Sequence, residues 1–91
     1  MAGRVYVVMG VTGEFDERVQ WPVAAFTDRA AAEKRAELAR EWLDENLNLA
    51  TVDNLWVWRQ KNKNPHDPNM VVTNTAVEWF IYDLEIEDSA Q

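Results

Sequence analysis

Three groups of side chains have types and spacings that could do chemistry. The first is His66 beside Asp67 in the segment NPHDPN, where an imidazole next to a carboxylate could act as a general base or hold a metal ion. Base catalysis needs an imidazole oriented by a third group, and a metal site would need further ligands, but the chain has no second histidine. Because prolines flank the pair, we interpret it as a surface turn. A small ligand-binding domain or an enzyme that uses the His66–Asp67 loop is the alternative.

The second group is a row of carboxylates, Asp83, Glu85 and Glu87, that alternate along one predicted strand. Residues two apart on a strand stand about 6.5–7 Å from each other. That spacing would suit a glycosidase pair if a sugar cleft lay above it. The last strand of a 91-residue chain offers no predicted cleft. We therefore interpret the row as a solvated or partner-facing acidic surface.

The third group is Glu14, Asp16 and Glu17 in GVTGEFDER. Cation-binding loops space their Asp, Asn and Gly residues more tightly than this, so the segment is interpreted as the bend of a hairpin in which Gly13 takes a positive φ. The glycines Gly10 and Gly13 match neither the dinucleotide-binding nor the P-loop spacing. Since the chain also lacks cysteine, thiolate chemistry and zinc–sulfur sites are excluded. We expect no catalytic residue, no cofactor and no metal.

Size and charge limit the remaining classes of function. Ninety-one residues, 47% apolar and 27% charged, fit one globular domain spanning residues 1–91. The net charge of −7 disfavours direct binding of nucleic acid or anionic lipid. The apolar run near the N-terminus, Val5–Met9, is too short for a signal sequence or a membrane span. We expect a cytoplasmic protein that binds neither nucleic acid nor membrane.

Periodicity predicts the elements that position these groups. Residues 4–12, 18–26 and 76–88 are rich in β-branched and aromatic residues and are predicted strands. Residues 26–47 change to a 3.6-residue period and form a helix capped by Thr27 or Asp28. A second, shorter helix over residues 51–61 is favoured; one long bent helix, since no glycine or proline interrupts residues 28–63, and a strand over LWVWR are the alternatives. Residues 61–75, with two prolines and four asparagines, are a loop and the segment expected to be most mobile, and residues 87–91 are an acidic tail.

The element order β-β-α-(α)-β predicts an α+β fold with a three-stranded antiparallel or mixed sheet. A right-handed crossover from the second strand to the third leaves room for the first strand between them, antiparallel to both, so the predicted sheet order is 2-1-3. Pro22 agrees, because a proline cannot donate to a central ladder and belongs on an edge strand. The helix layer can then cover only one face of the sheet.

The uncovered face is the candidate protein-interaction surface. If the last strand turns Phe80, Tyr82, Leu84 and Ile86 toward the helix, with Val5, Val7, Met9 and Val11 of the first strand, the alternate residues are left uncovered. Contiguous exposed apolar surface of this kind usually marks an interface, and acidic residues would rim it. Of the tryptophans, Trp21, Trp42 and Trp56 are assigned to the core and Trp58 to the surface or an interface. The candidate residues are Tyr6, Val8, Val77, Trp79, Ile81, Asp83, Glu85, Glu87 and Trp58.

Three stretches resemble small uncharacterised proteins encoded by bacteriophages and prophages. They are VYVVMGVTGEFDERVQWPVAAFTDRAAAE (5–33), NPHDPN (64–69) and WFIYDLEI (79–86). They carry a glycine–acidic–aromatic–aspartate hairpin turn, a Phe-x-Asp helix start, an Asn-Pro-x-Asp-Pro loop and a C-terminal strand. The resemblance implies no catalytic residue. It implies a phage accessory protein that acts on a host component in the cytoplasm.

Together these observations predict a small acidic, non-enzymatic interaction module that binds a host protein or itself as a homodimer. One concrete version is a phage inhibitor whose acidic row occupies the nucleic-acid-binding surface of a host defence complex. The enzyme or ligand-binding alternative predicts an ordered 64–69 loop that lines a pocket, whereas the interaction hypothesis predicts a mobile one. A homodimeric structural protein is the third interpretation.

Overall fold

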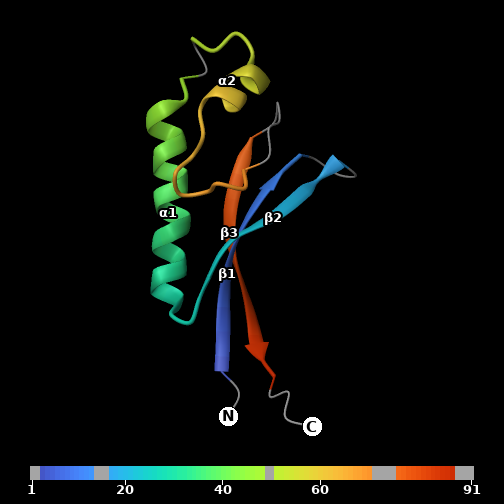
Figure 1. The fold of residues 1–91 in the computed structure, drawn as a ribbon, viewed down its shortest axis with the longest axis vertical. Helices are drawn as coiled ribbons and strands as arrows, with labels where there is room; N and C mark the ends of the chain where they lie inside the picture. Colours follow the sequence, from blue (N-terminus) through green and yellow to red (C-terminus); the bar gives the residue numbers. More distant parts are fainter. Residues whose placement is uncertain (1–2, 14–16, 49–50, 71–75, 88–91) are drawn as a thin grey trace.

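The computed structural model describes residues 3–13, 17–48, 51–70 and 76–87. The predicted α+β architecture and the predicted element order are confirmed, including the second helix (Figure 1). One sheet lies beside a single long helix, with the short helix near that helix's C-terminal end (Figure 1). The elements are β1 Gly3–Thr12, β2 Val19–Phe26, α1 Arg29–Asn46, α2 Leu55–Lys61 and β3 Val77–Ile86.

The sheet has the predicted order β2-β1-β3, with β1 antiparallel to both neighbours. Pro22 lies on the edge strand β2, beside an irregularity in the pairing between Val8 and Met9 of β1 and their partners. A missing N–H is tolerated at such a position, because the edge strand and the bulge leave one ladder bond unmade. Gly13, just after β1, has φ +92°, as a turn that only glycine adopts readily requires. Residues 14–16 of the predicted bend lie outside the described residues.

Both helices begin at side-chain caps. At the start of α1, Asp28 accepts a hydrogen bond from the backbone N–H of Ala30, and at α2 Asn54 accepts one from Val57. The buried residues of α1 recur every three to four positions and three of the four are alanines, which lets the helix approach the sheet closely. These residues are Ala32, Ala36, Ala39 and Leu43.

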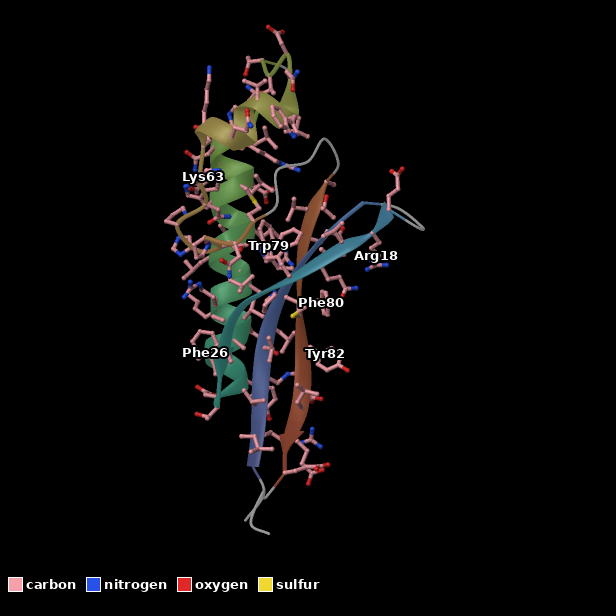
Figure 2. The ribbon with its side chains drawn as sticks, turned by 45° about the vertical axis from the view of Figure 1, so that its right-hand side comes forward. Arg18, Phe26, Lys63, Trp79, Phe80 and Tyr82 are labelled. Atoms are coloured by element: carbon pink, nitrogen blue, oxygen red, sulfur yellow. The ribbon has the colours of Figure 1, made fainter. Side chains whose placement is uncertain are left out.

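The helix covers the opposite sheet face from the one predicted. Val8 is fully buried and Trp79 is 4% exposed in one core cluster with α1, whereas Tyr82 is 53% exposed. Figure 2 shows Trp79 toward α1 and Tyr82 on the other side of the sheet. The alternation was assigned correctly but its direction was wrong, because both sets are apolar and alternation alone does not say which one the helix covers.

β1 and β3 pair with each other over their full length, and together they extend the sheet beyond the end of β2. Pairing with β2 begins at Tyr6, so Gly3–Val5 pairs only with Leu84–Ile86 as a two-stranded ribbon. This ribbon extends past the start of α1 in Figure 1. It contributes to an elongated shape of 54 × 28 × 18 Å.

The two tryptophans of α2 are exchanged relative to expectation. Trp58 packs against the core and lies 6.0 Å, centroid to centroid, from Trp42, whereas Trp56 is 43% exposed. A helical spacing of two residues separates side chains by about 200°, so only one could turn inward. Trp58 turned inward, and its assignment to the surface was wrong.

Candidate functional site

The most organised polar group of the molecule surrounds Asp67. Its side chain is buried, and Oδ2 accepts hydrogen bonds from the indole N–H groups of Trp79 at 2.7 Å and Trp21 at 2.8 Å. Oδ1 accepts from the same Trp21 N–H at 3.1 Å and from the backbone N–H of Asn69 at 3.2 Å. Two tryptophans from opposite edges of the sheet thus converge on one carboxylate.

The sheet register brings those two indoles together. Gly10 of β1 pairs with Trp21 on one side and with Trp79 on the other, so the three residues form one row across the sheet. A Cβ atom on Gly10 would lie 2.3–2.5 Å from ring atoms of Trp21, so the ring occupies the space that a side chain would need. Gly10 is therefore a packing site for Trp21 and not a part of the bend.

The loop that carries Asp67 is fastened to three elements. Arg35 of α1 donates to the His66 carbonyl at 2.7 Å, and the side chain of Asn64 donates to the Ala39 carbonyl at 3.0 Å. Asn64 also accepts from the backbone N–H of His66, and Asn69 donates to the Pro22 carbonyl of β2. Residues 62–70 are therefore held in place by specific hydrogen bonds. These bonds argue against the mobile loop expected for residues 64–69, and residues 71–75 lie outside the described residues.

This geometry is relevant to the alternative in which the His66–Asp67 loop serves an enzyme or a small ligand-binding domain. Both oxygens of Asp67 already accept hydrogen bonds from within the protein, so the carboxylate faces the interior and not a substrate. Across the part of the chain that the structure describes, no cluster of three or more His, Cys, Asp or Glu residues could hold a metal ion. Asp67 is a structural acceptor, and of its loop only Asn62, next to α2, is among the described residues that line the pockets described next.

Two pockets lie around α2. One, of about 460 Å³, opens between the end of α1, α2 and the start of β3, with the lining residues Leu43, Asp44, Leu47, Leu55, Arg59, Ala76 and Val77. Arg59 is 1% exposed, and this burial lowers the pKa of its guanidinium. The other pocket, of about 390 Å³, includes Asn46, Asn54 and Trp58 in its lining. Neither contains a histidine or a paired set of carboxylates, so neither indicates a particular reaction.

The carboxylates of the predicted acidic row do not share one environment. Asp83 lies 3.5 Å from a guanidinium nitrogen of Arg4 and 3.7 Å from one of Arg29, so two cations offset its charge. Arg29 also forms an ion pair with Glu33 at 3.0 Å and stacks over the Tyr6 ring at 5.7 Å. Glu85 and Glu87 are exposed beyond this group. The row therefore begins with an exposed residue that is already paired with two cations of the same chain.

The face of the sheet turned away from α1 carries exposed apolar side chains on the described part of β3. We call it the open face. Its exposed apolar side chains include Tyr82 at 53%, Leu84 at 44% and Ile86 at 45% of their surface, and Figure 2 shows Phe80 and Tyr82 on this side. By strand register, the open face comprises Val5, Val7, Met9, Val11, Gln20, Pro22, Ala25, Glu78, Phe80, Tyr82, Leu84 and Ile86. Of these, Val11 is buried, at 7% exposed.

The structure separates the predicted interaction residues into three places. Val8, Val77 and Trp79 are buried in the core, with Tyr6, Ile81 and Trp58 packed against it, so none of these six forms an open surface. Asp83 and Glu85 lie on the edge strand β3, and Glu87 directly follows its end. On β1, and on β3 apart from Glu78, the open face instead consists of the residues that the sequence analysis had turned toward the helix. A signal for the true arrangement was present, because an indole N–H needs an acceptor when buried and the Asp67 loop supplies one.

The sequence matches no family model, and comparisons with curated proteins and with solved structures find no match either. Within the described ranges, neither helix combines the length and the apolar character that a membrane crossing requires.

Proposed function

We propose that this chain is a small non-enzymatic interaction module that docks on an apolar surface of another polypeptide through its open face. The observation that carries the proposal is the exposure of Tyr82, Leu84 and Ile86, each more than two-fifths exposed on the side that α1 leaves uncovered. These residues are consecutive on one face of β3 and adjoin the apolar residues Val5 and Val7 of β1. Contiguous apolar surface of this kind marks interaction sites on soluble proteins.

The polar organisation of the molecule supports the same proposal. The buried donors and acceptors around Asp67 satisfy one another, which is how structural networks behave. Among the described residues, the buried hydrogen-bond network lies on the covered side of the sheet, at Trp21 and Trp79. The tyrosine of the open face offers an apolar ring with one polar tip, a side chain that is enriched at protein interfaces.

The phage resemblance would make the partner a host protein. The more specific version, an inhibitor whose acidic row occupies a nucleic-acid-binding surface, finds less support, because Asp83 contacts Arg4 and Arg29. The apolar open face and not the acidic row therefore defines the proposed contact.

The test compares three tagged forms of the chain as baits in a bacterial lysate. The first is the wild type, the second carries Tyr82→Ser and Leu84→Ser, and the third carries Trp56→Ser as a matched control. Trp56 is also a large exposed side chain, at 43%, but lies on α2 away from the sheet. The proposal expects at least one protein, a second copy of this chain included, to be retained by the wild type and the control and lost with the double variant. Retention that is the same for all three baits would overturn it.

A further inference from the structure

We propose that a second copy of this chain occupies the open face, with two sheets packed face to face around a two-fold axis that runs along β1. This inference rests on the proposed function and names its partner. Around such an axis β1 lies over β1 of the copy, and the edge strand β2 lies over β3. Aligned packing of two sheets, about 10 Å apart, is an ordinary arrangement for apolar faces.

The distribution of charge permits this pairing although each copy carries a net charge of −7. Among the open-face residues defined above, Glu78 is the single charged side chain. Asp83 and Glu85 belong to the alternate set of β3 residues, opposite Tyr6 and Arg4, so they turn away from the partner. Two acidic molecules would thus meet where neither presents a field of like charge.

Two charges at one end of the open face, Glu78 and Arg18, are complementary under this symmetry. Glu78 stands in one row with Val11 and Gln20, at the β3 edge, and Arg18 precedes Gln20 by two residues at the β2 edge. Both side chains are exposed, and Figure 2 shows Arg18 on the same side as Phe80 and Tyr82. Rotation about an axis along β1 places the β2 edge of one copy over the β3 edge of the other. The same ends of the two sheets stay together. Arg18 of each copy is then brought to Glu78 of the other, and the contact forms twice.

The alternative is a two-fold axis perpendicular to the strands. It would place the end of each sheet that carries Arg18 and Glu78 over the opposite end of the copy, where the exposed side chains are Leu84 and Ile86. The charges would then be placed against apolar surface without a partner, which costs free energy. The position of Arg18 and Glu78 at one end therefore selects the axis along β1.

The size of the face limits the area that the dimer can bury. Three strands of up to ten residues make a face of roughly 33 by 15 Å. Two such faces bury about 1,000 Å², the lower limit for a specific interface. We expect a reversible dimer with a dissociation constant in the micromolar range, on the order of 1–100 μM.

Sedimentation equilibrium of the purified full chain over 1–300 μM tests the inference with the variants R18E and E78R. Each reversal alone places two pairs of like charges across the axis, so each should raise the dissociation constant at least ~10-fold. An equimolar mixture of the two variants should restore association, because every contact between unlike variants again joins opposite charges. The single chain carrying both reversals should also dimerise like the wild type. Circular dichroism checks that each variant keeps its fold.

The outcomes separate this inference from the proposed function. A wild type that remains monomeric to 300 μM overturns the second copy as occupant, while a lysate partner lost with Tyr82→Ser and Leu84→Ser would keep the interaction module. A dimer that neither reversal weakens overturns the axis along β1. Association that survives Tyr82→Ser and Leu84→Ser forms through another surface, such as the free edge of β3, and also overturns the inference. Restoration in the mixture, together with loss in each variant alone, supports it.

Discussion

The two faces of the sheet are built from alternate residues of the same three strands, yet they differ in the number of polar groups and in how these are hydrogen-bonded. The covered face holds two indoles, Trp21 and Trp79, whose N–H groups both reach Asp67. The open face is apolar apart from Gln20, Glu78 and the tyrosine hydroxyl of Tyr82.

This difference teaches that hydrophobicity alone does not decide which face of a sheet is covered. A buried indole needs an acceptor, and the 62–70 loop supplies it only on the side of α1. Leu84 and Ile86 need no acceptor, and both remain more than two-fifths exposed on the open face. The covered face holds the core of the described fold, and the open face is the surface proposed for a partner.

The largest expected effect compares one aromatic residue from each face. Trp79→Ala should lower the free energy of unfolding by about 3–5 kcal/mol, because a buried aromatic side chain is lost and a cavity is left. Tyr82→Ala should lower it by less than about 1 kcal/mol, since half of that side chain is already exposed. Urea unfolding followed by circular dichroism at low protein concentration measures both. Equal losses would contradict the assignment of the two faces.

The next effect concerns the shared acceptor. Asp67→Ala should cost roughly 3 kcal/mol, because two buried indole N–H groups lose their partner. Asp67→Asn should cost less, about 1–2 kcal/mol, since one amide oxygen can still accept from both indoles while the amide nitrogen faces the N–H of Asn69.

Urea unfolding measures these variants too, with Glu45→Ala, an exposed carboxylate on α1, as the control. The Asp67 interpretation is wrong if Asp67→Ala unfolds at the same urea concentration as that control.

A smaller effect is expected from the glycine between the two tryptophans. Gly10→Ala should destabilise the protein by about 1–3 kcal/mol, because its Cβ would overlap the Trp21 ring and the indole would have to move from Asp67. Gly3→Ala is the matched control on the same strand, where the nearest atom to a new Cβ is 3.9 Å away. Thermal unfolding of both variants tests the pair, and a neutral Gly10→Ala would show that the row can shift without cost.

The smallest effect is expected at the edge, where the predicted acidic row begins. Asp83→Asn removes two exposed ion pairs, with Arg4 and Arg29, and should cost about 0.2–1 kcal/mol at low salt. The loss should shrink as ionic strength rises, because salt screens exposed pairs. Glu87→Gln, at an exposed position, should change little under either condition. A salt-independent loss at Asp83 would mean that its role is packing and not charge.

The fold could be predicted from the sequence because its signals are local. Each signal determines the local structure where it occurs. The switch from a two-residue to a 3.6-residue period marks the helix, the cap at Asp28 marks its start, and the proline on β2 indicates an edge strand. The short helix after Asn54 could also be expected from the spacing of its apolar residues.

The covered face could not be predicted in the same way, because it depends on contacts far apart in sequence. Trp21 and Asp67 are 46 residues apart, and the choice of face follows from their hydrogen bond. NPHDPN was interpreted as a turn, and it is one, but its aspartate points inward and so anchors the loop. Gly10 was read together with the bend, although its neighbours across the sheet are two tryptophans.

The central strand β1 pairs with β2, the next strand in the sequence, and with β3, which lies much further along the chain. Thr12, for example, pairs with Val77. During synthesis β1 must therefore wait, with one hydrogen-bonding edge exposed, until the ribosome has released more than sixty further residues. Pairings of such long sequence separation slow folding and lengthen the time in which an unpaired edge can aggregate. Ribosome-bound chains that stop before β3 would be the species most in need of a chaperone.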